Sequence, residues 1–179
     1  MLKMSDSVSN KSVKTESLFG ASKATVAVLM GSDSDWKVMQ AACEALAHFE
    51  VPYCAKILSA HRTPVEMIEF AKSAATEGYK IIVAGAGGAA HLPGMLASAT
   101  ILPVIGVPVA TTILEGQDSL LSIVQMPKGV PVATVAINGA FNAGILAARI
   151  LGGSDEAMAQ KLNHYQKSIA EESRNKTLT

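Results

Sequence analysis

The chain has little charge and few aromatic side chains. Its 15 basic and 15 acidic side chains give a formal net charge of zero at pH 7, and charged residues make up 17% of the 179 residues. This balance argues against non-specific binding to nucleic acid or to an anionic membrane surface, so neither is an expected partner. Aromatic residues are 4% of the chain, which disfavours a site that holds a flavin ring by stacking. The 49% of hydrophobic residues instead favour one domain with a substantial core.

Cysteine is also scarce. Cys43 falls in a predicted helix and Cys54 in a predicted strand, and both are expected to be buried thiols of a protein in the reducing cytoplasm. No group of cysteine and histidine residues has the spacing of a metal site, so no metal is expected.

The N-terminal segment has no hydrophobic stretch. Residues 1–22 are polar and rich in serine and lysine, which predicts a disordered tail rather than a secretory signal. A single domain over residues 23–175, ending in a helix, is expected to follow.

Between Lys80 and Glu115 the chain carries no Asp, Glu, Lys or Arg. Glycine and proline residues divide this stretch into pieces that are too short to span a membrane. It is therefore expected to form a strand, a loop, a helix and a second strand that are buried on both sides.

Hydrophobic runs alternate with segments of helical periodicity. The predicted strands are 25–30, 53–58, 80–84, 103–107 and 132–137. The predicted helices are 36–49, 64–76, 91–99, 118–126, 141–151 and 155–172. This alternation predicts an α/β fold, namely a three-layer, doubly wound, flavodoxin-like parallel sheet with strand order 2-1-3-4-5. The helix at 141–151 is hydrophobic on nearly every side, so a homo-oligomer is expected to cover it.

Several residues are expected to mark helix boundaries. Thr63 is expected to cap the helix that starts with Pro64, and Gly78 to end it. Asp118 is expected to cap the helix at 118–126.

The first of three polar loops at predicted strand ends runs from Gly31 to Asp35. Glycine lets the backbone approach a ligand, and the hydroxyls of Ser32 and Ser34 together with free helix amides can hold a phosphate. The carboxylate of Asp35 can accept hydrogen bonds from ribose hydroxyls. Ordinary helix capping by Ser34 or Asp35 explains the pattern equally well, so both interpretations stay open.

The second loop contains Ser59, His61 and Arg62 at the carboxyl end of the second predicted strand. A histidine titrates near about 6.5, so it can carry a proton at neutral pH. An arginine can hold a phosphate or a carboxylate with two parallel hydrogen bonds. A lone histidine is usually structural, but its place beside an arginine at the ligand-binding edge of a sheet favours function.

The third loop runs from Gly85 to His91. It fits the dinucleotide-binding pattern G-x-G-x-x-A formally, but it follows the third strand and no acidic residue ends a strand about 20 residues later, so that interpretation is rejected. Its glycines are expected to let backbone amides reach a small anion such as a carboxylate. His91 is either catalytic or a residue that orders the loop.

These segments together resemble the class I N5-carboxyaminoimidazole ribonucleotide mutase family of purine biosynthesis. The matching stretches are GSDSDW (31–36), SAHRTP (59–64), AGAGGAAHLPGM (84–95), GVPV (106–109) and DSLLSIVQMPKGVPVAT (118–134). The resemblance implies an isomerase that moves a carboxyl group from the exocyclic nitrogen to carbon 4 of an aminoimidazole ribonucleotide. It implies a homo-octamer and no cofactor, whether metal, ATP or organic group.

By motif position, the resemblance implies that His61 is the general acid and base. The implied nucleotide-binding residues are Gly31, Ser32, Ser34, Asp35, Ser59 and Arg62. Of these, Arg62 and the two serines Ser34 and Ser59 would lie near the phosphate, and Asp35 near the ribose. Gly87, Gly88, Ala89 and His91 would face the migrating carboxylate. A transient contact with the ATP-dependent synthetase that makes the labile substrate is a further expected interaction.

Two alternative functions stay open. A direct carboxylase would use aminoimidazole ribonucleotide and carbon dioxide, but that group resembles SAHKGP where this chain has SAHRTP, and it lacks the AHLPG segment. A non-catalytic flavin or nucleotide binding module on the same fold would leave His61 and His91 without a role.

Overall fold

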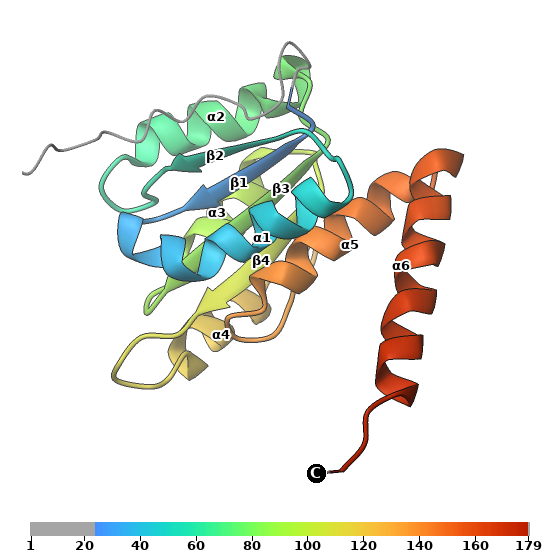
Figure 1. Ribbon diagram of the computed structural model, residues 1–179. Helices are drawn as coiled ribbons and strands as arrows, with labels where there is room; N and C mark the ends of the chain where they lie inside the picture. The colour runs from blue at the N-terminus through green and yellow to red at the C-terminus, as the bar shows by residue number, and fades with distance from the viewer. Residues whose placement is uncertain (1–23, 179) are drawn as a thin grey trace, which may run out of the picture.

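A five-stranded parallel sheet forms the centre of the molecule, with the order β2-β1-β3-β4-β5 (Figure 1). The computed structural model describes residues 24–178, so the expected tail over 1–22 lies outside the described residues. The strands are β1 (Val26–Met30), β2 (Tyr53–Ile57), β3 (Ile81–Gly87), β4 (Val104–Val109) and β5 (Ala133–Thr134). The helices are α1 (Trp36–His48), α2 (Pro64–Glu77), α3 (Leu92–Ala99), α4 (Gln117–Val124), α5 (Ala140–Gly152) and α6 (Glu156–Arg174), and a short 3-10 helix, η1 (Asp33–Asp35), precedes α1. The predicted flavodoxin-like fold and its strand order are confirmed.

Helices cover both faces of the sheet, which is why its strands are hydrophobic on both sides. Val26, Val28 and Met30 of β1 pack in a cluster with α1 and α5. Ala27 and Leu29 of the same strand pack on the other face with α2, α3 and α4. With both faces covered, a site has to form at an end of the strands. In folds of this kind it forms at their carboxyl ends.

Small residues let α5 lie close against α1 (Figure 1). A Cβ atom built on Gly144 of α5 would lie 2.6 Å from the carbonyl oxygen of Ala42 and 2.7 Å from the Cβ of Ala45. Hydrophobic side chains of α5 also reach the surface, since Phe141 and Ile150 are exposed to 38% and 40%. The sheet therefore buries only one side of this helix.

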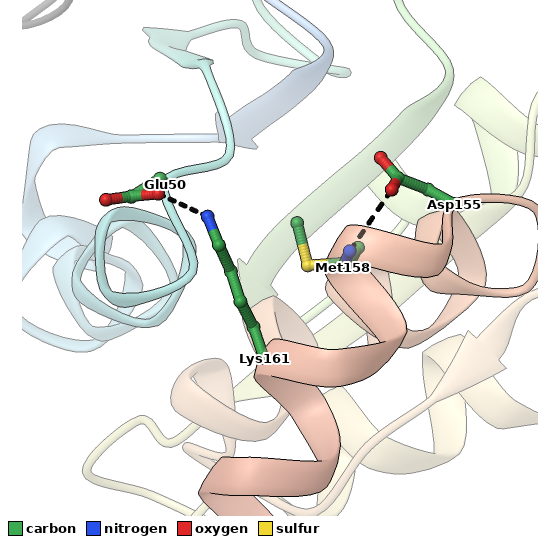
Figure 2. A network of polar contacts seen from close by, with 4 residues as sticks. All are labelled: Glu50, Asp155, Met158 and Lys161. Carbon is green, nitrogen blue, oxygen red and sulfur yellow. Dashed lines mark hydrogen bonds and ion pairs between the residues drawn. The ribbon is translucent and has the colours of Figure 1, made fainter.

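Helix α6 is held at its N-terminal half and extends away from the sheet beyond it (Figure 1). The carboxylate of Asp155 caps it by accepting a hydrogen bond from the amide of Met158, at 3.1 Å. Figure 2 shows this cap beside the ion pair between Lys161 and Glu50, which follows α1. The hydrogen bond from Lys161 lowers the pKa of the Glu50 carboxyl. None of the helices within residues 24–178 is long and hydrophobic enough to cross a membrane.

The last strand is shorter than predicted. Hydrogen bonds from the amides of Val135 to Gly106 and of Asn138 to Pro108 keep residues 135–138 beside β4. The carbonyl of Pro108 accepts a hydrogen bond on the β5 side, but Pro108 has no N–H to donate there. The regular backbone hydrogen bonding between β4 and β5 therefore cannot continue. The expected strand at 132–137 is therefore reduced to Ala133–Thr134.

One of two expected N-terminal helix caps is confirmed in position and the other is wrong. Thr63 occupies the capping position of α2 as expected, although its hydroxyl donates to the carbonyl of Ser59 at 3.0 Å and caps no amide of the helix. Helix α4 starts after Gly116, whose φ is 92°, so Asp118 lies within its first turn. Gly78, with φ 101°, ends α2 as predicted.

The cysteines lie in the expected elements. Cys43 is buried in α1, and burial raises the pKa of its thiol to about 12. Cys54 lies half-buried in β2. A thiol with so high a pKa is present as the unreactive protonated form at neutral pH.

Candidate active site

Arg62 joins the first polar loop to the second. Its Nη2 donates to the carbonyl oxygen of Gly31 at 2.5 Å, and its Nε donates to the hydroxyl of Ser59 at 3.1 Å. The amide of Arg62 also donates to this hydroxyl, at 3.3 Å. The guanidinium is exposed, so one fixed cation stands where the loops after β1 and β2 meet.

His61 and His91 join the second loop to the third. The Nε2 atom of His61 lies 2.8 Å from the Nδ1 atom of His91, and the two rings are perpendicular. Hydrogen bonding at this distance requires one proton between the two nitrogens, so one imidazole donates and the other accepts. Both rings are exposed at the edge of the sheet, where they can meet a ligand.

Ser32 caps the first loop, where the sequence suggested Ser34 or Asp35. Its hydroxyl accepts from the amide of Ser34 at 3.4 Å, and its own amide donates to Asp35 Oδ2 at 3.1 Å. The hydroxyl of Ser32 also donates to Asp33 at 2.9 Å, and this contact is the main reason that the pKa of the Asp33 carboxyl is lowered. The capping interpretation is thus confirmed: Ser32 caps η1, and Asp35 occupies the capping position of α1 as expected, without a side-chain hydrogen bond there. The phosphate-binding interpretation stays a prediction.

Asp35 is the buried carboxylate of the site. Its residue is 8% exposed, and burial raises the pKa of its carboxyl. Through Oδ2 it holds the amide of Ser32. Among the described residues no fully buried side-chain oxygen lacks a hydrogen-bond partner, so its other oxygen, Oδ1, is either bonded or open to solvent.

The backbone amides of the third loop are mostly occupied. The amide of Gly88 donates to the hydroxyl of Ser119, that of Ala90 to the carbonyl of Gly88, and that of His91 to the carbonyl of Ala89, each at 2.8 Å. Within residues 24–178, the amide of Ala89 has no acceptor. Within residues 88–91 one N–H is therefore free, and the expectation that amides of this loop face a small anion stays a prediction.

Glycine is required at the start of this loop. Gly88 has a φ of 62°, in the left-handed region. A Cβ atom on Gly87 would lie 2.9 Å from the Cγ2 atom of Thr111 and 3.3 Å from the carbonyl oxygen of Val109. The loop after β3 thus turns sharply while it passes close to the end of β4.

Ser119 is the residue that sequence reasoning missed. It lies within the helix predicted at 118–126, but no role was assigned to it; it is fully buried and its hydroxyl accepts from the Gly88 amide. One signal was available in the sequence. Ser119 lies four residues before Ile123, so its hydroxyl falls on the same hydrophobic face of the helix, and both side chains are buried in α4. Such a signal does not indicate which loop the hydroxyl meets.

The three loops therefore converge where β1 and β3 are neighbours. This is the point at which the strand order reverses, because β2 lies on one side of β1 and β3 on the other. In doubly wound sheets this switch point is the usual ligand site. In the part of the chain that the structure describes, no three His, Cys, Asp or Glu side chains are grouped to hold a metal ion. The arrangement provides a fixed cation, a pair of imidazoles, a free backbone amide and a buried carboxylate.

Comparison with known proteins gives a consistent set of relatives. Residues 25–172 match the family described as AIR carboxylase. The N5-carboxyaminoimidazole ribonucleotide mutase of Mycobacterium leprae is 61% identical, over 82% of this chain and 85% of its own. The protein of the same name from Thermotoga maritima is 60% identical, over 82% and 86%.

Other relatives carry a different name or are known as structures. The phosphoribosylaminoimidazole carboxylase of Candida glabrata is 57% identical over 84% of this chain, which corresponds to only 26% of that longer protein. The crystal structure of Treponema denticola PurE is similar with a TM-score of 0.76 and 29% identity, and covers 85% of this chain and 98% of that one.

Proposed function

The chain belongs to the AIR carboxylase family, and we propose that it is a mutase of purine biosynthesis. It converts N5-carboxyaminoimidazole ribonucleotide to 4-carboxy-5-aminoimidazole ribonucleotide, the reaction for which its relatives at 56–61% identity are named. The observation that carries the proposal is this identity over about four fifths of the chain. The convergence of a histidine pair with Arg62 supports it, because the reaction needs a proton carrier beside an anionic substrate.

His61 is the proposed proton carrier. It first donates a proton to the carbamate nitrogen as the bond from nitrogen to the carboxyl carbon breaks and carbon dioxide leaves. Carbon 4 of the imidazole ring then forms a bond to carbon dioxide, and the proton of carbon 4 returns to His61. One histidine thus acts as acid and then as base, and atoms and charges balance over the cycle.

His91 is proposed to orient His61 rather than to exchange protons with the substrate. When Nδ1 of His91 accepts from Nε2 of His61, the remaining nitrogen of His61 is directed elsewhere and can meet the substrate.

The nucleotide is proposed to bind across the first two loops. Arg62, Ser34 and Ser59 would hold the phosphate, because an exposed guanidinium that is already oriented by Ser59 is suited to bind an anion. Gly31 and Ser32 would line the approach. Asp35 would meet the ribose hydroxyls through Oδ1, since Oδ2 is bonded to the Ser32 amide.

The migrating carboxylate is proposed to lie over the third loop. The free amide of Ala89 offers one hydrogen bond, and Gly88 leaves open space, since no atom lies within 4 Å of a Cβ built there. Gly87 and Gly88 present no polar side chain, which suits carbon dioxide. Holding this molecule against carbon 4 is a proximity effect, worth about 7–11 kcal/mol in well-oriented cases.

A direct carboxylase is the second candidate, because relatives named phosphoribosylaminoimidazole carboxylase are 57% identical to this chain. It would use aminoimidazole ribonucleotide and carbon dioxide from solution. The chain corresponds to 26% of each of those proteins, so their name describes a longer chain.

The test compares two substrates on the purified full-length chain without ATP. One is freshly made carbamate nucleotide at low bicarbonate, and the other is aminoimidazole ribonucleotide with added bicarbonate. Fast conversion of the carbamate alone is the result that the mutase predicts. Turnover only of the second substrate, rising with bicarbonate, would make the chain a carboxylase, and no turnover of either would contradict both.

Three broader properties belong to the same proposal. We place the enzyme in the cytoplasm, where two free thiols suit a reducing environment. We propose a homo-octamer, supported by the exposed hydrophobic side chains Phe141 and Ile150 of α5. A transient contact with the synthetase that supplies the labile carbamate completes it.

A further inference from the structure

Ser119 connects α4 with the loop that carries Gly88. Its side chain is fully buried. The hydroxyl donates to the carbonyl oxygen of Val109 at 2.8 Å and accepts from the amide of Gly88 at 2.8 Å. Both contacts are ideal in length, and a single hydroxyl makes both because it is at once donor and acceptor.

The position of these contacts explains why a hydroxyl is needed. Strands β3 and β4 are paired up to Gly87 opposite Val109. At the next residue the two chains separate, so the amide of Gly88 and the carbonyl of Val109 are bridged by the Ser119 hydroxyl. The hydroxyl thus extends the β3–β4 hydrogen bonding by one position, and α4 controls how the loop leaves the sheet.

The contact also determines which amide stays free. Gly88 has a φ of 62°, and its carbonyl accepts from the amide of Ala90. With the Gly88 amide bonded to Ser119, the amide of Ala89 is the one within residues 88–91 that has no acceptor. Two residues further on, His91 contacts His61.

We infer that Ser119 is a positioning residue for the transfer step: it fixes the Gly88 turn, and through it aims the Ala89 amide and His91 at the migrating carboxylate. The inference rests on the proposed mutase function. It predicts that Ser119 acts on the step that moves the carboxyl group and not on nucleotide binding, because it contacts neither Arg62 nor the first loop.

The kinetic test replaces the hydroxyl. Ser119→Ala leaves the Gly88 amide and the Val109 carbonyl without their partner, and we expect kcat for the carbamate to fall by about 10- to 100-fold while KM changes by less than about threefold. Ile123→Val, also fully buried on α4, is the matched control, and is expected to lower the melting temperature with kcat unchanged. Wild-type kcat in Ser119→Ala, or an equal loss of kcat in Ile123→Val, would overturn the inference.

Residue-resolved amide hydrogen exchange of the wild-type protein tests the contact without a variant, should Ser119→Ala not fold. The Gly88 amide is expected to exchange more slowly than the Ala89 amide. Equal, fast exchange of the two would overturn the inference. Absence of turnover by the wild type would contradict the proposed function itself, and the exchange result would still decide whether Ser119 holds the loop.

Discussion

At the scale of single residues, the proposed chemistry depends on two histidines that contact one another from different loops. His61 follows β2 and His91 precedes α3, and 2.8 Å separates their facing nitrogens. A single proton between them keeps one imidazole as donor and the other as acceptor. In the proposed mechanism this leaves one nitrogen of His61 for the substrate, and the next residue, Arg62, is held by its hydrogen bond to the Gly31 carbonyl.

If His61 carries the proton, its replacement should lower kcat. His61→Asn should lower kcat by about 100- to 10,000-fold, the usual contribution of general acid and base catalysis, with a small change in KM. Steady-state kinetics with the carbamate substrate measure this, and His164→Asn, an exposed histidine of α6, is the control. Near-normal turnover in His61→Asn would show that another group carries the proton.

The buried carboxyl of Asp35 is expected to lower the stability of the fold at neutral pH, although the same carboxylate is proposed to bind the ribose. Because burial raises the pKa of its carboxyl, the unfolded chain loses this proton first as pH rises, so its contribution to stability is full at low pH and is lost as pH rises through the folded pKa. Asp35→Asn removes this dependence while an amide oxygen can still accept from Ser32.

Urea unfolding at about pH 3 and pH 7 should therefore show that Asp35→Asn gains stability relative to the wild type on going to pH 7. KM for the nucleotide should rise by about tenfold if the carboxylate holds the ribose. A relative stability that is independent of pH would contradict the burial argument, and an unchanged KM would remove Asp35 from the ribose site.

Sequence alone identified most polar residues of the loops, because residue type and position at a strand end are visible in it. It did not identify Ser32 as the cap, since Ser34 and Asp35 are equally suited by type. It also did not reveal the role of Ser119, because the partner of that hydroxyl is 31 positions away, at Gly88. Contacts of this kind depend on how two elements pack.

At the scale of helices and strands, the contact between α5 and α1 depends on Gly144. Gly144→Ala places a Cβ atom 2.6 Å from the Ala42 carbonyl, so we expect it to reduce the free energy of unfolding by about 1–3 kcal/mol. Gly153→Ala is the matched control, since its φ of −64° is helical and its nearest atom lies at 3.4 Å. Chemical denaturation compares the two variants, and equal stabilities would contradict close packing at Gly144.

The helices and strands themselves were largely predictable, since hydrophobic periodicity reports which side of each is buried. Gly78 ended α2 as expected, because the left-handed conformation there favours glycine. The shortness of β5 was not predictable from its own residues, because it follows from Pro108 in the neighbouring strand.

At the scale of the whole molecule, hydrophobic side chains remain uncovered on α5. Phe141 and Ile150 are exposed at opposite flanks of the buried stripe of this helix, since they are about two and a half turns apart. In the proposed octamer these side chains are subunit contacts. Sedimentation should then give a mass of about eight times the 18.6 kDa of one chain, and Ile150→Glu should shift the distribution to smaller species. A monomer for the wild type would contradict the proposed assembly.

The proposed mutase moves the carboxyl group without releasing carbon dioxide to solvent, and an isotope measurement tests this. Carbamate nucleotide labelled with ¹³C in its carboxyl group is converted in unlabelled bicarbonate, and the label at carbon 4 of the product is measured by mass spectrometry. A mutase is expected to keep the label whatever the bicarbonate concentration, because carbon dioxide held over the third loop recombines before it escapes. Loss of the label to the level of the surrounding bicarbonate would show that carbon dioxide enters from solution, and that the chain is a carboxylase rather than a mutase.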